Sequence, residues 1–177
     1  MKLLISLLTV LFLIFATNTY AANSNQPESP EGVVQSLYRD FGWELKPDNN
    51  SKKLLIDQPI KILNRYFTPE LAELMKRDRR HEIKTKDLGH LDFVLLCGSQ
   101  DPDGITNIRI NGKPGKSIVT VMYDQNGEKD VMKIEFNTQH MKSGWRISDV
   151  HYRTRKSKAF PEPGLDLRLL DFLSQPY

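Results

Sequence analysis

The chain has 177 residues, with 25 Lys and Arg against 22 Asp and Glu and a formal net charge of +3. This small excess of bases does not indicate a nucleic-acid-binding protein. The single cysteine, Cys97, excludes an internal disulfide and a zinc site built on several thiolates. Its apolar neighbours Leu95 and Leu96 favour a buried, unreactive thiol.

The first residues have the three parts of a secretory signal peptide. Lys2 precedes an apolar run over residues 3–16, and Thr19-Tyr20-Ala21 presents small residues at the two positions that a signal peptidase reads. The run is shorter than the roughly 20 apolar residues of a membrane span. We therefore expect residues 1–21 to be a signal peptide cleaved near Ala21. The mature protein is then periplasmic or secreted and has no transmembrane segment.

The polar residues 22–29 are expected to form a disordered leader, and residues 30–177 a single domain. A helix is predicted from Pro30 to about Gly42, because Ser29 offers a cap and proline suits the first helical position. Its apolar face consists of Val33, Val34, Leu37 and Phe41. Tyr38 lies beside this face, where a buried hydroxyl needs a partner.

Two further helical segments are expected before the strands. A short amphipathic one follows Pro59, and Thr68-Pro69-Glu70 is a strong start signal for a longer helix. The longer helix has a basic end made of Lys76, Arg77, Arg79, Arg80 and His81. We interpret this end as solvated and compensating the helix dipole, since basic residues suit a helix C-terminus.

The region from Phe93 to Gly104 combines an apolar run with a turn-rich loop that contains Gln100 and Asp101. Asp101 and Asp103 alternate as in a calcium loop, but the distal glutamate is absent at the required spacing. No second histidine or acid stands at zinc-ligand spacing from His81, His90 or His140. No metal site and no cofactor are therefore predicted.

Four strands follow in apolar and polar alternation, at about 106–111, 117–123, 131–136 and 145–152. Asn126-Gly127 is a strong hairpin signal. The tail is predicted to end in a short helix from about Leu165 to Leu173. Helices first and an antiparallel sheet of about four strands second make an α+β fold.

Several residues and short sequence segments together indicate a family resemblance. They are Tyr38 in the first helix, YFTPELAELM at 66–75, LDF at 91–93, SQD at 99–101 and GWRISDVHY at 144–152. In these the chain resembles a bacterial envelope family known as domain of unknown function thirty-eight twenty-eight. The resemblance implies a nuclear transport factor two-like, or cystatin-like, superfold, in which a curved sheet wraps a long N-terminal helix into a cone with an open mouth. Many relatives are lipoproteins, but this chain lacks the cysteine at its predicted cleavage site.

The last predicted strand holds the catalytic candidates. If it is uninterrupted, Trp145, Ile147, Asp149 and His151 share one face, because side chains alternate with a period of two. If that face lines the cone, Asp149 and His151 would form a pair of general acid and base, as in enzymes that resemble this superfold.

A structural role for Asp149 is the stronger hypothesis. Its carboxylate would accept a hydrogen bond from the Gln100-Asp101 loop or from the Tyr38 hydroxyl, fixing helix to sheet. Trp145 is expected to be a core residue first and a surface for ligand binding second. The predicted binding residues are accordingly Tyr38, Gln100, Asp101, Trp145 and Asp149.

Three functional classes remain open. The first is a non-catalytic binding module that engages a protein partner as inhibitor, immunity factor or envelope accessory. The second is a small-molecule-binding protein or enzyme that uses Asp149 and His151, and the third is a structural subunit. The absence of nucleophile, phosphate and metal motifs favours the first class, as a monomer or weak dimer. The basic runs at 76–80 and 153–158 predict salt-sensitive association with an acidic partner.

Overall fold

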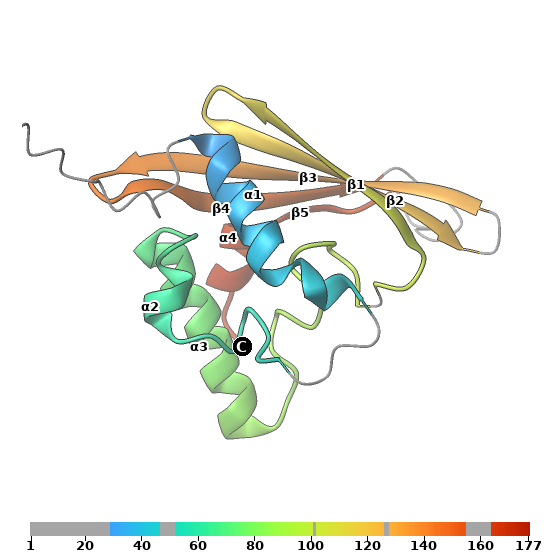
Figure 1. The fold of residues 1–177 in the computed structure, drawn as a ribbon. Coiled ribbons are helices and arrows are strands. Elements are labelled where there is room, and N and C mark those ends of the chain that lie inside the picture. The colour runs from blue at the N-terminus through green and yellow to red at the C-terminus, as the bar shows by residue number, and fades with distance from the viewer. Residues whose placement is uncertain (1–28, 47–51, 101, 126–127, 155–163) are drawn as a thin grey trace, which may run out of the picture.

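The computed structural model describes residues 29–46, 52–100, 102–125, 128–154 and 164–177. The predicted signal peptide, nearly all of the predicted leader, Asp101 and the hairpin residues Asn126-Gly127 lie outside the described residues. The chain forms an α+β fold in which helices pack on one side of an antiparallel sheet (Figure 1). The predicted fold class is thereby confirmed.

Local capping sets the helix starts as the sequence predicts. The Ser29 hydroxyl accepts a hydrogen bond from the Gly32 amide at 2.9 Å, and the Thr68 hydroxyl accepts one from the Leu71 amide at 3.4 Å. Proline occupies the first turn of both helices that follow these caps. The helices are α1 (Pro30–Phe41), the 3-10 helix η1 (Gly42–Leu45), α2 (Ile60–Leu63), α3 (Pro69–Thr85) and α4 (Leu169–Ser174).

The sheet is a meander in which each strand pairs antiparallel with the next. Its strands are β1 (Ile105–Lys113), β2 (Lys116–Gln125), β3 (Glu128–Met141), β4 (Gly144–Thr154) and β5 (Asp166–Arg168). All four predicted strands are present, and each is longer than predicted. The fifth strand corrects the sequence prediction, because Asp166–Arg168 pairs with β4 and only residues after it are helical.

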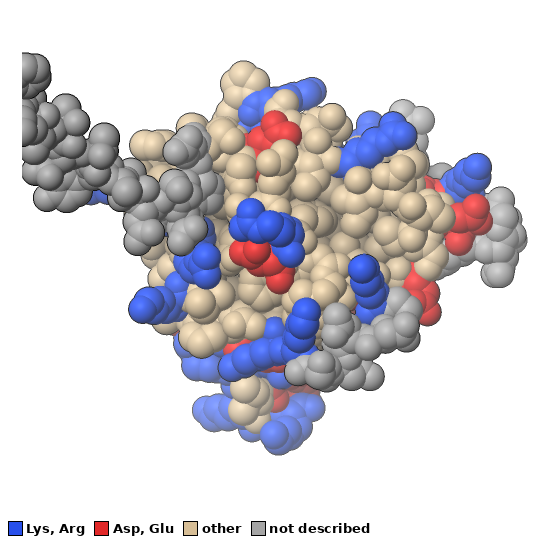
Figure 2. All heavy atoms as spheres, in the orientation of Figure 1, with Lys and Arg blue, Asp and Glu red and all other residues tan. Residues whose placement is uncertain are grey.

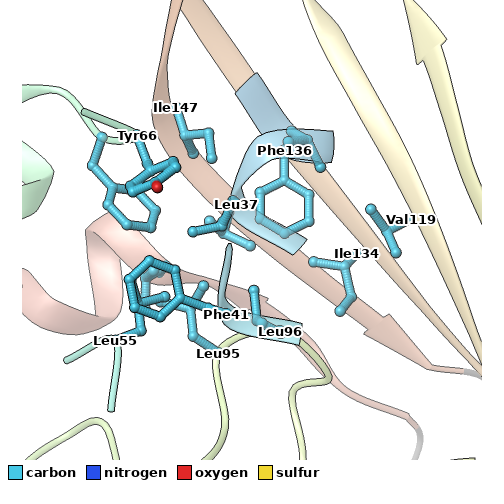
Figure 3. Close-up of a cluster of buried hydrophobic side chains, with 14 of the residues drawn as sticks. Leu37, Phe41, Leu55, Tyr66, Leu95, Leu96, Val119, Ile134, Phe136 and Ile147 are labelled. Atoms are coloured by element: carbon cyan, nitrogen blue, oxygen red, sulfur yellow. The ribbon is translucent and has the colours of Figure 1, made fainter. Parts of the chain in front are cut away.

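The core lies between the helices and the sheet. The sheet contributes one row of side chains from each long strand, for example the paired Val119 and Ile134, and α1 contributes Leu37. Figure 3 shows Leu37 with Ile134 and Phe136 of β3 on one side and Tyr66 on the other. Burying a side chain of this size stabilises the fold by roughly 1.5–3 kcal/mol. This row of side chains therefore fixes which face of the sheet meets the helices.

No helix of the described residues lies on the opposite face of the sheet, which we call the outer face (Figure 1). The edge of β4 is covered by β5 and by Phe67, whose segment exchanges backbone hydrogen bonds with Ile147. No helix in the described part has the length and hydropathy that a membrane crossing requires.

Candidate functional site

A tight turn of six residues, 94–99, lies inside the core, and we call it the core turn. The Val94 amide donates to the Ser99 carbonyl at 2.9 Å, and the Gly98 amide donates to the Val94 carbonyl at 2.8 Å. Leu96 and Cys97 are fully buried, which confirms the prediction that the Cys97 thiol is buried. A buried turn must find partners for its backbone carbonyls, because unpaired ones cost free energy.

Three tyrosine hydroxyls supply these partners. Tyr152 of β4 donates to the Leu95 carbonyl at 2.8 Å, Tyr38 of α1 to the Leu96 carbonyl at 2.6 Å, and Tyr123 of β2 to the Cys97 carbonyl at 2.9 Å. Burial raises the pKa of all three hydroxyls far above the ordinary value, so each stays a donor. The core turn is thus tied to one helix and two strands.

The core turn lies against both α1 and the helix-facing side of the sheet. The resemblance to the cystatin-like superfold implies an open cone there, but in this chain the region is filled by buried side chains, among them Leu95 and Leu96 (Figure 3). Cys97 is buried as well. Two clefts lie beside the turn. A cleft of about 260 Å³ borders it on the side of α3, and a second of about 440 Å³ borders it on the side of Leu165 and Leu167.

The predicted residue Gln100 lies where the two clefts meet. Both clefts are lined by Gln100, Asp92 and Phe93, and the Gln100 amide donates to the Asp92 carboxylate at 2.7 Å. The cleft on the α3 side, which we call the α3 cleft, has polar and apolar walls. Its lining residues are Glu44, Leu54, Leu55, Ile56, Met75, Arg79, Glu82, Leu91, Asp92, Phe93, Val94, Leu95 and Gln100.

Glu44 is the most perturbed carboxyl of the α3 cleft. Burial raises its pKa from 4.5 to about 7, the hydrogen bond from the Leu55 amide opposes this, and the charge of Asp57 adds to it. Arg79 is the one basic residue among the described residues that line this cleft, and it bonds to Asp57 at 2.6 Å and to Glu82 at 2.5 Å. Arg79 is therefore already neutralised by two carboxylates other than Glu44.

Replacing Glu44 by glutamine is expected to change how stability depends on pH. The folded pKa of about 7 exceeds the ordinary value of 4.5, so the Glu44 contribution to stability is fully present below pH 4.5 and is lost as the pH rises through about 7. Asp57, Arg79, Glu82 and Asp92 also face this region. Urea unfolding should show the variant more stable than the parent by about 2 kcal/mol at alkaline pH and similar to it near pH 4.5.

A constant difference between the two proteins across that range would contradict the buried-carboxyl explanation. Glu73→Gln is the matched control, because Glu73 lies on the exposed side of α3 in a surface pair with Arg80. That variant should follow the parent at every pH.

The catalytic candidates do not share a face with Ile147, contrary to the prediction. The pairing of β3 with β4 shifts register between Asn137 and Thr138, so that Asn137 opposes Asp149 but Thr138 opposes Ile147. This β-bulge at Ser148 places Trp145 and Ile147 on the helix side and Asp149 and His151 on the outer face. The pair therefore does not line the space that the core turn fills.

Asp149 holds the C-terminal helix and not α1. Its carboxylate accepts the Leu170 amide at 3.0 Å and lies 3.6 Å from the guanidinium of Arg168. The expected partners have other bonds, since Tyr38 donates to the core turn and Gln100 to Asp92. Asp149 thus has a structural role, but with a partner that the sequence analysis did not predict.

His151 is bonded on both sides of its ring. Its Nε2 contacts the Asp166 carboxylate, and its Nδ1 lies 2.9 Å from a guanidinium nitrogen of Arg153. The hydrogen bond with His151 is the main cause that lowers the pKa of Asp166. Trp145 lies edge-on to the ring of His140 at a centroid distance of 5.2 Å. Neither contact brings His151 or Trp145 to the core turn.

The sequence analysis missed a buried carboxylate, Asp78, on α3. It is 1% exposed and accepts the His90 amide at 2.7 Å, the Leu91 amide at 3.0 Å and the Tyr177 hydroxyl at 3.0 Å. Burial acts to raise its pKa, but these bonds outweigh it and hold the pKa below the ordinary value. A signal existed, because Asp78 lies three residues after Met75 on the apolar face of the helix.

The basic residues of α3 are largely engaged by neighbours. Figure 2 shows Lys and Arg gathered at the lower end of the molecule, where Figure 1 places α3. Arg77 donates to the Leu173 carbonyl, Arg79 pairs with two carboxylates, and Arg80 lies 2.7 Å from Glu73. The prediction of a solvated basic helix end is wrong, because α3 continues to Thr85 and these residues lie in its middle, where their contacts tie them to neighbouring groups.

The outer face carries a different set of cations. Arg109, Lys133 and Arg153 are exposed and lie in one row across β1, β3 and β4, with Thr120 of β2 between the first two. We call this the cationic row. Among the described residues, no carboxylate forms an ion pair with Arg109 or Lys133.

The described residues contain no cluster of three or more histidine, cysteine or acidic side chains that would hold a metal ion. With the fold and these surfaces established, the chain was compared with known proteins. No family model, no curated protein and no solved structure matches it.

Proposed function

We propose that this protein is an exported, non-catalytic binding module whose outer sheet face engages an acidic surface of a protein partner. Export to the periplasm or beyond the cell rests on the signal-peptide pattern of residues 1–21. The partner role is that of an inhibitor, immunity factor or envelope accessory, exercised as a monomer or weak dimer. Membership of the envelope family that the chain resembles belongs to the same proposal.

The observation that carries the proposal is the cationic row. Lys133 and Arg153 stand directly opposite each other in the β3–β4 pairing. Like charges in that position destabilise a sheet by roughly 0.2–1 kcal/mol. A sequence keeps such a local conflict most often where a surface has a function. Because the three side chains are exposed and no helix in the described ranges covers this face, an acidic partner can reach the row.

The geometry gives no support to the alternative of an enzyme using Asp149 and His151. The Asp149 carboxylate is occupied by the Leu170 amide, and the His151 ring by Asp166 and Arg153. Both side chains are buried at less than 9% exposure, so neither offers a free proton acceptor to a substrate.

Charge reversal of Lys133 separates binding from folding. Lys133→Glu puts an acid opposite Arg153, so we expect the variant to gain about 0.5 kcal/mol in free energy of unfolding. The same change should weaken partner binding at least about tenfold at low salt, because it removes a cation and adds an anion. Urea unfolding measures the first effect, and affinity capture from an envelope extract, followed by titration of the captured protein, measures the second.

Arg80→Glu is the matched control, with the same change in charge at an exposed site on α3. It should retain the partner that the parent binds. Capture should also weaken between about 0.05 M and about 0.5 M salt, because screening shortens the reach of surface charges. A partner that binds Lys133→Glu and the parent equally well would overturn the proposal.

A further inference from the structure

The α3 cleft has an excess of acids over bases in its walls. Its lining includes the three acids Glu44, Glu82 and Asp92 and one base, Arg79. Arg79 is shared by Glu82 and by Asp57. The other two acids accept hydrogen bonds from neutral donors only, Glu44 from the Leu55 amide and Asp92 from the Gln100 amide.

The rest of the wall is apolar apart from Gln100, and it is exposed at its rim. Its apolar side chains are Leu54, Leu55, Ile56, Met75, Leu91, Phe93, Val94 and Leu95. Leu54 is 46% exposed at the rim, so the cleft opens to solvent there. A volume of about 260 Å³ exceeds the roughly 150 Å³ that suffices for one benzene ring in a protein interior. The space therefore fits one aromatic ring and a short chain.

A carboxylate in such a setting favours a cationic ligand. An ammonium group gives Glu44 the charged partner that its surroundings lack, and the apolar walls take the body of the ligand. We propose that the α3 cleft binds a small aryl-alkyl primary amine, with its ammonium group between the carboxylates of Glu44 and Asp92. This site is separate from the cationic row, and the proposal does not depend on the partner function.

The raised pKa of Glu44 agrees with this geometry. A carboxylate whose charged form is penalised by burial gains most from a cation beside it. Glutamine in its place keeps the shape and the acceptor for the Leu55 amide but cannot carry the charge. Glu44→Gln therefore tests the charge without emptying the cleft.

The test compares two ligands of nearly equal shape, 2-phenylethylamine and 2-phenylethanol. Calorimetric titration of the purified protein at about pH 8, where Glu44 is ionised, should show the amine binding at least about tenfold more tightly than the alcohol. Glu44→Gln and Asp92→Asn should each reduce that preference to about threefold or less. Glu73→Gln, which changes an exposed acid elsewhere on α3, should leave it unchanged.

Three results would overturn the proposal. They are equal affinity for amine and alcohol, no binding of either at millimolar concentration, or an undiminished preference in folded Glu44→Gln. A lysine side chain of another protein offers the same ammonium group on a thin alkyl chain. Nα-acetyl-lysine amide, which mimics it, is therefore titrated as a third ligand. We expect it to bind at least about tenfold more weakly than 2-phenylethylamine, because it lacks the ring that fills the apolar wall. Equal or tighter binding would reject the aryl-alkyl amine.

Discussion

Replacing Gly98 by alanine is expected to lower the free energy of unfolding by about 3 kcal/mol. The residue has φ +67°, a conformation that costs a side-chain-bearing residue roughly 1–3 kcal/mol. An added Cβ would also stand 2.7 Å from a ring carbon of Tyr152. Since that ring carries the hydroxyl bonded to Leu95, moving it disturbs the core turn itself.

Gly115→Ala is the matched control for this change. Gly115 has a similar φ of +72°, but an added Cβ would meet no atom within 4 Å. The Gly115→Ala variant should lose about 1 kcal/mol of its free energy of unfolding, from backbone strain alone. Urea unfolding of both variants measures the difference. Equal losses would mean that the contact with Tyr152 contributes nothing.

Replacing Asp78 by alanine is expected to cost about 3–4 kcal/mol. The change leaves the amides of His90 and Leu91 and the Tyr177 hydroxyl without their acceptor, and buried donors without partners are costly. The loop after α3 can pass this close to Asp78 because residue 89 is glycine, since a Cβ added there would lie 2.6 Å from an Asp78 carboxylate oxygen. The buried carboxylate thus joins α3, the following loop and the last residue of the chain.

The Asp78 effect should fade in acid. Its folded pKa lies below the ordinary 3.8, so its contribution is present above that value and is lost as the pH falls through the folded pKa. Asp87→Ala is the control, because Asp87 is exposed, and it should stay within about 0.5 kcal/mol of the parent. Thermal and urea unfolding at neutral pH measure both variants. A similar small loss in the two would show that the Asp78 bonds do not stabilise the fold.

Local signals account for the parts of the fold that were predicted. Capping residues and proline mark the starts of α1 and α3, and alternation marks β1 to β4, because these patterns depend on a few neighbouring residues. The strand β5 was missed because three residues are too few for a pattern. Only its pairing with His151 to Arg153 makes it a strand.

The candidate site depended on contacts that sequence spacing does not contain. Alternation placed Asp149 and Ile147 on one face, but one extra residue at the Ser148 bulge reversed that relation. The polar pattern around Ser148 gives no sign of the bulge, since polar residues stand on both faces of β4. Likewise Tyr38 was expected to need a partner, but its acceptor is 58 residues away in the chain.

The three tyrosine bonds to the core turn make the protein sensitive to alkali. In the unfolded chain these phenols ionise near the ordinary pKa of 10, whereas in the folded protein burial holds their pKa values far higher. Their stabilisation is complete below pH 10 and is lost as the pH rises further, because only the unfolded state releases the protons. Ionisation of Tyr38, Tyr123 and Tyr152 and release of the core turn are therefore one cooperative event.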